Sequence, residues 1–181
     1  MKRNCEAAAF LGAKKIVVHP WGIPKSDEFL KSIQESVGTL LEIARSYHLD
    51  LLLENCCCIH NSPFENLKKI CALYPDLGVI IDTRPGQFHR ELPKICSDTE
   101  FICKHVRHIH INDYHGGYMQ WDALQPILHP GVGDVDFDAF FSSFRAAGYE
   151  GSFTLEAPSM RSDTVAFNEI NRNLDFIRNK C

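Results

Sequence analysis

The sequence predicts an α/β fold in which successive βα units build a parallel sheet. Short apolar, β-branched runs alternate with longer segments of helical periodicity. Three of the runs are almost continuously apolar, as expected for parallel strands that are buried on both faces. Neither a GxGxxG motif nor a P-loop follows the first run, so a doubly wound nucleotide-binding fold would lack its usual chemistry. The β/α barrel, with an active site at the carboxyl ends of its strands, is the class that fits.

Five runs are expected to be strands, and each carries a polar side chain at its last or last but one position. They cover residues 15–19, 49–54, 77–82, 106–111 and 151–156. Alternation of strands and helices indicates one parallel sheet, so the polar ends should gather at one edge.

Helices are expected between the strands, over residues 27–47, 63–73, 136–147 and 163–179. The second opens with a capping box from Ser62 to Glu65, with proline at the first helical position. Gly148 marks the end of the third helix, and Ser162 is the expected N-cap of the fourth. Residues 87–104 are expected to form a loop and a short helix.

Length and composition describe a globular protein. The 181 residues suit one domain, 45% are hydrophobic and 23% are charged. The net charge of −4 and a pI near 6.1 argue against nucleic acid or an anionic membrane as the main partner. No apolar run approaches the roughly 18 residues of a membrane span, and no secretory signal is visible. A cytoplasmic location is therefore expected.

The eight cysteines are interpreted as reduced thiols. One alternative is a soft-metal site formed by the run Cys56-Cys57-Cys58 with His60. No CxxC pair supports it. Small buried residues at a strand end explain the run equally simply.

The strand ends carry the most informative pattern, which consists of His19, Glu54, Asp82, His110 and Glu156. A buried carboxylate is costly unless it is paired or coordinated, and a divalent cation removes the repulsion between converging carboxylates. Any one of these acids alone would be read as a helix cap or a loop residue. Together, Glu54, Asp82, His110 and Glu156 predict a site for one divalent ion, with Mn²⁺, Co²⁺, Zn²⁺ or Mg²⁺ suiting the donors.

Motifs along most of the chain resemble the xylose isomerase-like TIM barrel superfamily. They are His19-Pro20-Trp21-Gly22, Glu54-Asn55, Asp82-Thr83, His108-Ile109-His110-Ile111-Asn112-Asp113, Gly131-Val132-Gly133-Asp134-Val135-Asp136-Phe137, Gly148-Tyr149-Glu150-Gly151 and Glu156. The superfamily contains sugar phosphate isomerases and epimerases, inosose dehydratase-type enzymes and the AP endonuclease family 2-like group, which includes endonuclease IV. The motif set is specific for the superfamily and not for a substrate.

The resemblance implies a metal held by Glu54, Asp82, His110 and Glu156 at the ends of strands five to eight. It implies an isomerase or epimerase of a small sugar, sugar phosphate or polyol, with Glu54 and Glu156 as the catalytic carboxylates. The expected substrate-binding residues are His19, His108, Asp113 and Trp21. His108 and His110 point to the same face, and the sequence does not decide which reaches the metal. The expected partner is a small carbohydrate, and a homo-oligomer is left open.

Two departures from the family pattern qualify the expectation. Strands one to three, roughly 90 residues of a typical barrel, have no counterpart. Residues 1–181 are therefore interpreted as a single domain without its N-terminal part, an incomplete (β/α)8 barrel covering about strands four to eight. Its sheet would have two open edges. Truncation is the favoured explanation, and a second chain supplying the missing part is the other.

The second departure is Pro85, which stands where the family often has a substrate- or metal-contacting histidine. Gln125-Pro126-Ile127 likewise replaces a histidine motif of the endonucleases, and His129 is out of register. Phosphodiester hydrolysis is therefore less favoured than one-metal sugar chemistry. The alternatives kept are an inosose dehydratase-like lyase, an endonuclease IV-like hydrolase and an inactive truncated fragment.

Overall fold

A computed structural model describes the backbone of residues 1–22, 24–158, 160–161 and 164–180. Its main sheet has five parallel strands in the order β1-β2-β3-β4-β5. Their bounds fall within the five predicted runs: β1 (Lys15–Val18), β2 (Asp50–Glu54), β3 (Gly78–Asp82), β4 (Val106–Ile111) and β5 (Ser152–Leu155). The order confirms an incomplete (β/α)8 barrel, with β1 and β5 as edge strands.

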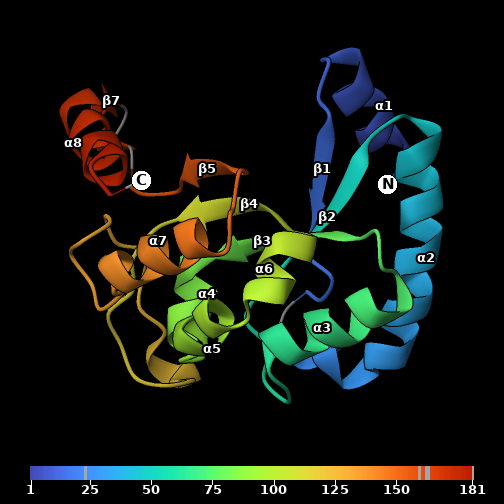
Figure 1. Cartoon of the computed structure of the whole chain (residues 1–181), viewed down its shortest axis with the longest axis horizontal. Coiled ribbons are helices and arrows are strands. Elements are labelled where there is room, and N and C mark those ends of the chain that lie inside the picture. Colours follow the sequence, from blue (N-terminus) through green and yellow to red (C-terminus); the bar gives the residue numbers. More distant parts are fainter. Residues whose placement is uncertain (23, 159, 162–163, 181) are drawn as a thin grey trace. The chain divides into compact units, whose positions relative to one another are not determined.

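Contacts divide the chain into two compact units, residues 1–80 and 81–181. Unit 1 contains α1 (Lys2–Phe10), β1, the 3₁₀ helix η1 (Pro24–Phe29), α2 (Leu30–Ser46), β2, α3 (Pro63–Leu73) and the start of β3. The long helix α2 contacts β2, α1 and α3 (Figure 1). It packs through a stripe of buried Val37, Leu41 and Ala44 at the expected helical spacing.

In unit 1, α3 begins with the N-cap predicted from the sequence, whereas α2 begins later than predicted. The Ser62 hydroxyl accepts a hydrogen bond from the Glu65 backbone N–H at 3.0 Å, and Pro63 opens α3, as predicted. The helix expected from residue 27 starts only at Leu30, because the preceding residues form η1. The buried Asp27 carboxylate instead accepts backbone N–H groups from the loop at 59–61.

Unit 2 contains the end of β3, then three short helices, β4, a long loop, α7, β5 and α8. The bounds are α4 (Thr83–Phe88), α5 (Leu92–Ser97), α6 (Thr99–His105), the 3₁₀ helix η2 (Trp121–Ala123), α7 (Phe137–Ala146) and α8 (Phe167–Arg178). A two-stranded antiparallel sheet, β6 (Met160–Arg161) with β7 (Thr164–Val165), lies between β5 and α8.

Two helix predictions in unit 2 were wrong. Residues 87–104 hold the end of α4 and two further helices, because Pro93 opens α5 and the Asp98 carboxylate caps α6 at the Phe101 N–H. The last helix begins at Phe167, not at residue 163. The N-cap predicted at Ser162 lies outside the described residues. For the third predicted helix, α7, the N-cap is Asp136.

An aromatic cluster holds α7 against β5. Phe137, Phe140, Phe141 and Phe144 are buried along α7, and the rings of Phe141 and Phe153 are 5.4 Å apart. Tyr149 packs against Phe153 and donates its hydroxyl to the Ser152 carbonyl at 3.0 Å. Burial raises the pKa of Tyr149, and nearby Arg107 partly opposes that rise. The neutral phenol is therefore part of the packed structure.

Within the described residues, none of the helices has the length and apolar character that crossing a membrane requires.

Candidate active site

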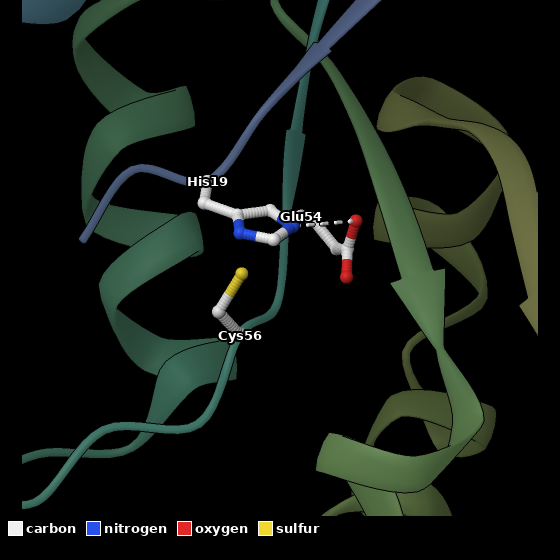
Figure 2. Close-up of side chains that lie close together, drawn as sticks. All are labelled: His19, Glu54 and Cys56. Carbon is white, nitrogen blue, oxygen red and sulfur yellow. Dashed lines mark ion pairs between the residues drawn. The ribbon is translucent and has the colours of Figure 1, made fainter. Parts of the chain in front are cut away.

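In unit 1, the parallel register of β1 and β2 places His19 beside Glu54. Val18 pairs with Leu53, so the next residue of each strand lies at the carboxyl end of the pair. The His19 Nε2 atom is 3.4 Å from a Glu54 carboxylate oxygen (Figure 2). The Glu54 side chain is 8% exposed and that of His19 is 65% exposed. A buried carboxylate is thus paired with an imidazole that solvent reaches.

Cys56 is a third member of this group, and it was not among the predicted strand-end ligands. One ligating atom each of His19, Glu54 and Cys56 lie within 4.8 Å of one another. Trp21 fixes the Cys56 backbone, because its indole N–H donates to the Cys56 carbonyl at 2.8 Å. Trp21 is only 2% exposed, so its visible role is to join the segments after β1 and β2. Substrate contact by Trp21 stays a prediction.

The alternative site built on Cys56-Cys57-Cys58 and His60 is not assembled. The His60 Nε2 atom pairs with Glu28 at 2.8 Å, and the Cys58 thiol donates to the Asn61 carbonyl at 2.7 Å. Among the described residues, neither Cys57, Cys58 nor His60 belongs to a group with metal-ligand spacing.

In unit 2, the structure brings His110 together with Glu156 and with Asp82. The His110 Nδ1 atom is 3.3 Å from a Glu156 carboxylate oxygen. A ligating atom of Asp82 lies within 4.8 Å of a ring nitrogen of His110. Asp82 ends β3 and also caps α4, since its carboxylate accepts the Arg84 N–H at 2.8 Å. Glu156 follows β5, and its N–H continues the sheet by donating to the Ile111 carbonyl.

The neighbouring histidine, His108, has a different role in the structure. Its Nδ1 lies 2.7 Å from the Ser152 hydroxyl and its Nε2 lies 2.9 Å from the Thr154 hydroxyl. Both ring nitrogens therefore contact β5 side chains. Of the two histidines on this face, His110 is the one that approaches Glu156. Substrate contact by His108 stays a prediction.

Asp113 organises the loop that precedes α7. It is fully buried, and its carboxylate accepts backbone N–H groups from Tyr114, Gly131, Gly133 and Val135 at 2.8–3.0 Å. A Cβ at Gly133 would lie 2.5 Å from this carboxylate, so glycine is required there. These contacts use both carboxylate oxygens. Asp113 would thus influence a substrate through the shape of the 131–135 loop.

Thr83 and Asn112 form a buried clamp that the sequence analysis did not identify. The Thr83 hydroxyl donates to the Asn112 carbonyl at 2.6 Å and accepts the Asn112 backbone N–H at 3.0 Å. Thr83 directly follows Asp82 at the end of β3, and Asn112 follows β4. The clamp therefore fixes the ends of these two strands. In the sequence, Thr83 and Asn112 stand in two of the motifs shared with the family, Asp82-Thr83 and Asn112-Asp113.

The donor set of unit 2 suits a divalent metal. Donors bound to one ion at about 2.0–2.2 Å lie roughly 3–4 Å apart, and the His110–Glu156 separation of 3.3 Å falls in that range. Carboxylate oxygens and an imidazole suit Mn²⁺, Co²⁺ or Zn²⁺. The spacing of the His110–Glu156 pair therefore fits two ligands of one metal ion.

Comparison with known proteins shows the family of the chain. The family model described as "Xylose isomerase-like TIM barrel" matches residues 1–180. The chain belongs to this family. No curated protein matches the sequence.

Several solved structures of the xylose isomerase-like fold are similar to the chain. One is the IolI protein with a bound zinc atom, at 21% identity and a TM-score of 0.75, covering 99% of this chain and 68% of that one. A second is a xylose isomerase domain protein from Planctomyces limnophilus, at 19% identity and a TM-score of 0.75, covering 98% and 62%. A third is the 3-keto-D-glucoside 4-epimerase of E. coli, at 23% identity and a TM-score of 0.70, covering 98% and 68%. The chain thus spans about two thirds of the length of these proteins.

Proposed function

We propose that the protein is a divalent-metal-dependent isomerase or epimerase of a small sugar, sugar phosphate or polyol. The observation that carries the proposal is that His110 is approached by two strand-end carboxylates of unit 2, Glu156 at 3.3 Å and Asp82 within 4.8 Å. Family membership supports it, because this family includes sugar isomerases and epimerases. A 3-keto-D-glucoside epimerase and a D-tagatose 3-epimerase-like protein are among the similar structures.

The proposed ligands are Asp82, His110 and Glu156, with Glu54 as the fourth. Glu54 ends β2 as Asp82 ends β3, and both follow the family motif order. A bound divalent ion would polarise a substrate carbonyl and its neighbouring hydroxyl, which makes the adjacent C–H more acidic.

Proton transfer is assigned to Glu54 and Glu156. Epimerisation next to a carbonyl needs one base to remove a proton and one acid to return it. The Glu156 side chain is 39% exposed and can therefore meet a substrate. Glu54 is buried beside the exposed His19, which is proposed to orient a substrate hydroxyl. His108, Asp113 and Trp21 position the surrounding segments.

Hydrogen exchange at carbon tests this function directly. The protein is depleted of metal, reloaded with Mn²⁺, Co²⁺, Zn²⁺ or Mg²⁺, and incubated in D₂O with ketoses, ketose phosphates and inososes. Metal-dependent deuterium incorporation next to the carbonyl, with formation of an isomer or epimer, is expected. Loss of water from the substrate would instead identify a lyase. Cleavage of an abasic DNA duplex without any carbon exchange would contradict the proposal.

A further inference from the structure

Three different metal-binding groups meet at the strand ends of unit 1. They are the His19 imidazole, the Glu54 carboxylate and the Cys56 thiol, with ligating atoms within 4.8 Å of one another. Figure 2 shows the Glu54 carboxylate beside the His19 ring and the Cys56 sulfur below the ring. All three residues lie within residues 1–80, so their arrangement is a property of unit 1 alone.

The backbone that carries these groups is fixed from several directions. The β1–β2 register sets His19 against Glu54. Trp21 lies two residues after His19 and donates its indole N–H to the Cys56 carbonyl, so one contact ties both segments. Beyond Cys56, the buried Asp27 carboxylate accepts the N–H groups of His60 and Asn61 at 3.0 and 2.9 Å. The backbone that carries the three ligands is therefore held in place before any ion arrives, which lowers the cost of binding.

The chemistry of the three donors selects the ion. A thiolate favours Zn²⁺ or Co²⁺ over Mg²⁺ and Mn²⁺, which prefer oxygen. Three protein ligands with one open position are typical of reactive zinc sites, whereas structural sites close all four positions. Partial exposure of His19 leaves the group open to solvent.

We propose that His19, Glu54 and Cys56 form a thiolate-containing binding site for Zn²⁺ or Co²⁺ at the carboxyl ends of β1 and β2. This site differs from the ligand set of the proposed function, which contains no sulfur. Glu54 is common to both sets. His19 and Cys56 belong to this one alone.

Cobalt spectroscopy of the whole chain tests the site. A thiolate bound to Co²⁺ gives a near-ultraviolet charge-transfer band that oxygen and nitrogen donors do not give. The metal-free protein should develop this band on titration with Co²⁺, and Zn²⁺ should suppress it by competition. Cys56→Ser should abolish the band, and His19→Ala should weaken Co²⁺ binding by at least about 10-fold.

Matched variants separate this proposal from other thiols and from the unit 2 centre. Cys57→Ser changes the adjacent half-buried thiol of the same loop and should keep the band. Asp82→Asn removes a proposed ligand in unit 2 and should also keep it, even where sugar turnover is lost. No band in the wild type, or a band that survives Cys56→Ser, would overturn the site. A band present in a protein without isomerase activity would support the site and count only against the proposed function.

Discussion

The strand ends of the two units carry similar groups in different surroundings. In unit 1, a buried glutamate meets an exposed histidine, with a thiol nearby. In unit 2, the histidine is the better buried partner, with a side chain 12% exposed, and the glutamate is 39% exposed. The exposed group is therefore an imidazole in one unit and a carboxylate in the other. An exposed carboxylate suits proton exchange with a substrate, whereas an exposed imidazole suits substrate orientation or ligation of a soft metal.

Both units also use a fully buried aspartate to hold the loop beside these groups. Asp27 accepts backbone N–H groups from residues 59–61, and Asp113 accepts them from residues 114–135. In both loops, charge-assisted hydrogen bonds to a buried carboxylate help to fix the backbone. Each unit therefore uses one buried carboxylate to fix a loop that follows a strand end.

The largest effect is expected from the exposed carboxylate of unit 2. Glu156→Gln removes a proton-transfer group, and turnover of any active substrate should fall by about 10²–10⁴-fold. Steady-state kinetics measure this loss. The exposed neighbour Glu150→Gln is the control and should keep wild-type rates. Unchanged turnover in Glu156→Gln would remove the assigned role.

The next largest effect concerns the loop-holding aspartates. Asp113→Ala leaves several buried N–H groups without an acceptor and should lower the free energy of unfolding by about 3 kcal/mol or more. Asp27→Ala should act in the same direction. Urea unfolding measures both, with the exposed Asp122→Ala as a control that changes stability by less than about 0.5 kcal/mol. A small loss at Asp113 would show that the loop does not depend on it.

A smaller effect is expected at the helix caps of the two units. Ser62→Ala in unit 1 and Asp136→Ala in unit 2 each remove one side-chain acceptor from a helix N-terminus. Each should lower the free energy of unfolding by about 1 kcal/mol. Chemical denaturation followed by circular dichroism measures these losses. A cost near zero at either site would mean that solvent replaces the cap there.

The smallest effect is a pH dependence specific to unit 2. Burial raises the pKa of Tyr149, so the folded state favours the neutral phenol. Above the ordinary tyrosine pKa of about 10, only the unfolded state ionises readily. The stabilisation contributed by Tyr149 is therefore complete below that pH and is lost as the pH rises. Tyr149→Phe should flatten the decline in stability above about pH 10, and an unchanged slope would exclude this cause.

Much of the fold was predictable because the strands are apolar runs bounded by polar ends. β3 is buried at every position, and few structures other than a buried strand are compatible with its run Val79-Ile80-Ile81. The short helices between residues 83 and 105 were harder, because helices of six or seven residues are too short to show a period. Their boundaries are set by local caps at Asp82 and Asp98.

The residues of the candidate site could be proposed from the sequence, whereas their pairings could not. Choosing His110 over His108 required knowing that β5 offers Ser152 and Thr154 hydroxyls to His108. The place of Cys56 depends on a loop that the Trp21 indole fixes from 35 residues away. Such long-range contacts leave no periodic trace in a sequence.

Manganese binding tests the central claim most directly. Titration of the metal-free protein with Mn²⁺, followed by electron paramagnetic resonance, should show one bound ion per chain. Asp82→Ala, His110→Ala and Glu54→Ala should each weaken binding by at least about 10-fold. Cys56→Ser should not change it, because Mn²⁺ has little preference for sulfur. Undiminished Mn²⁺ affinity in the Asp82 and His110 variants would contradict the assignment of these residues as ligands.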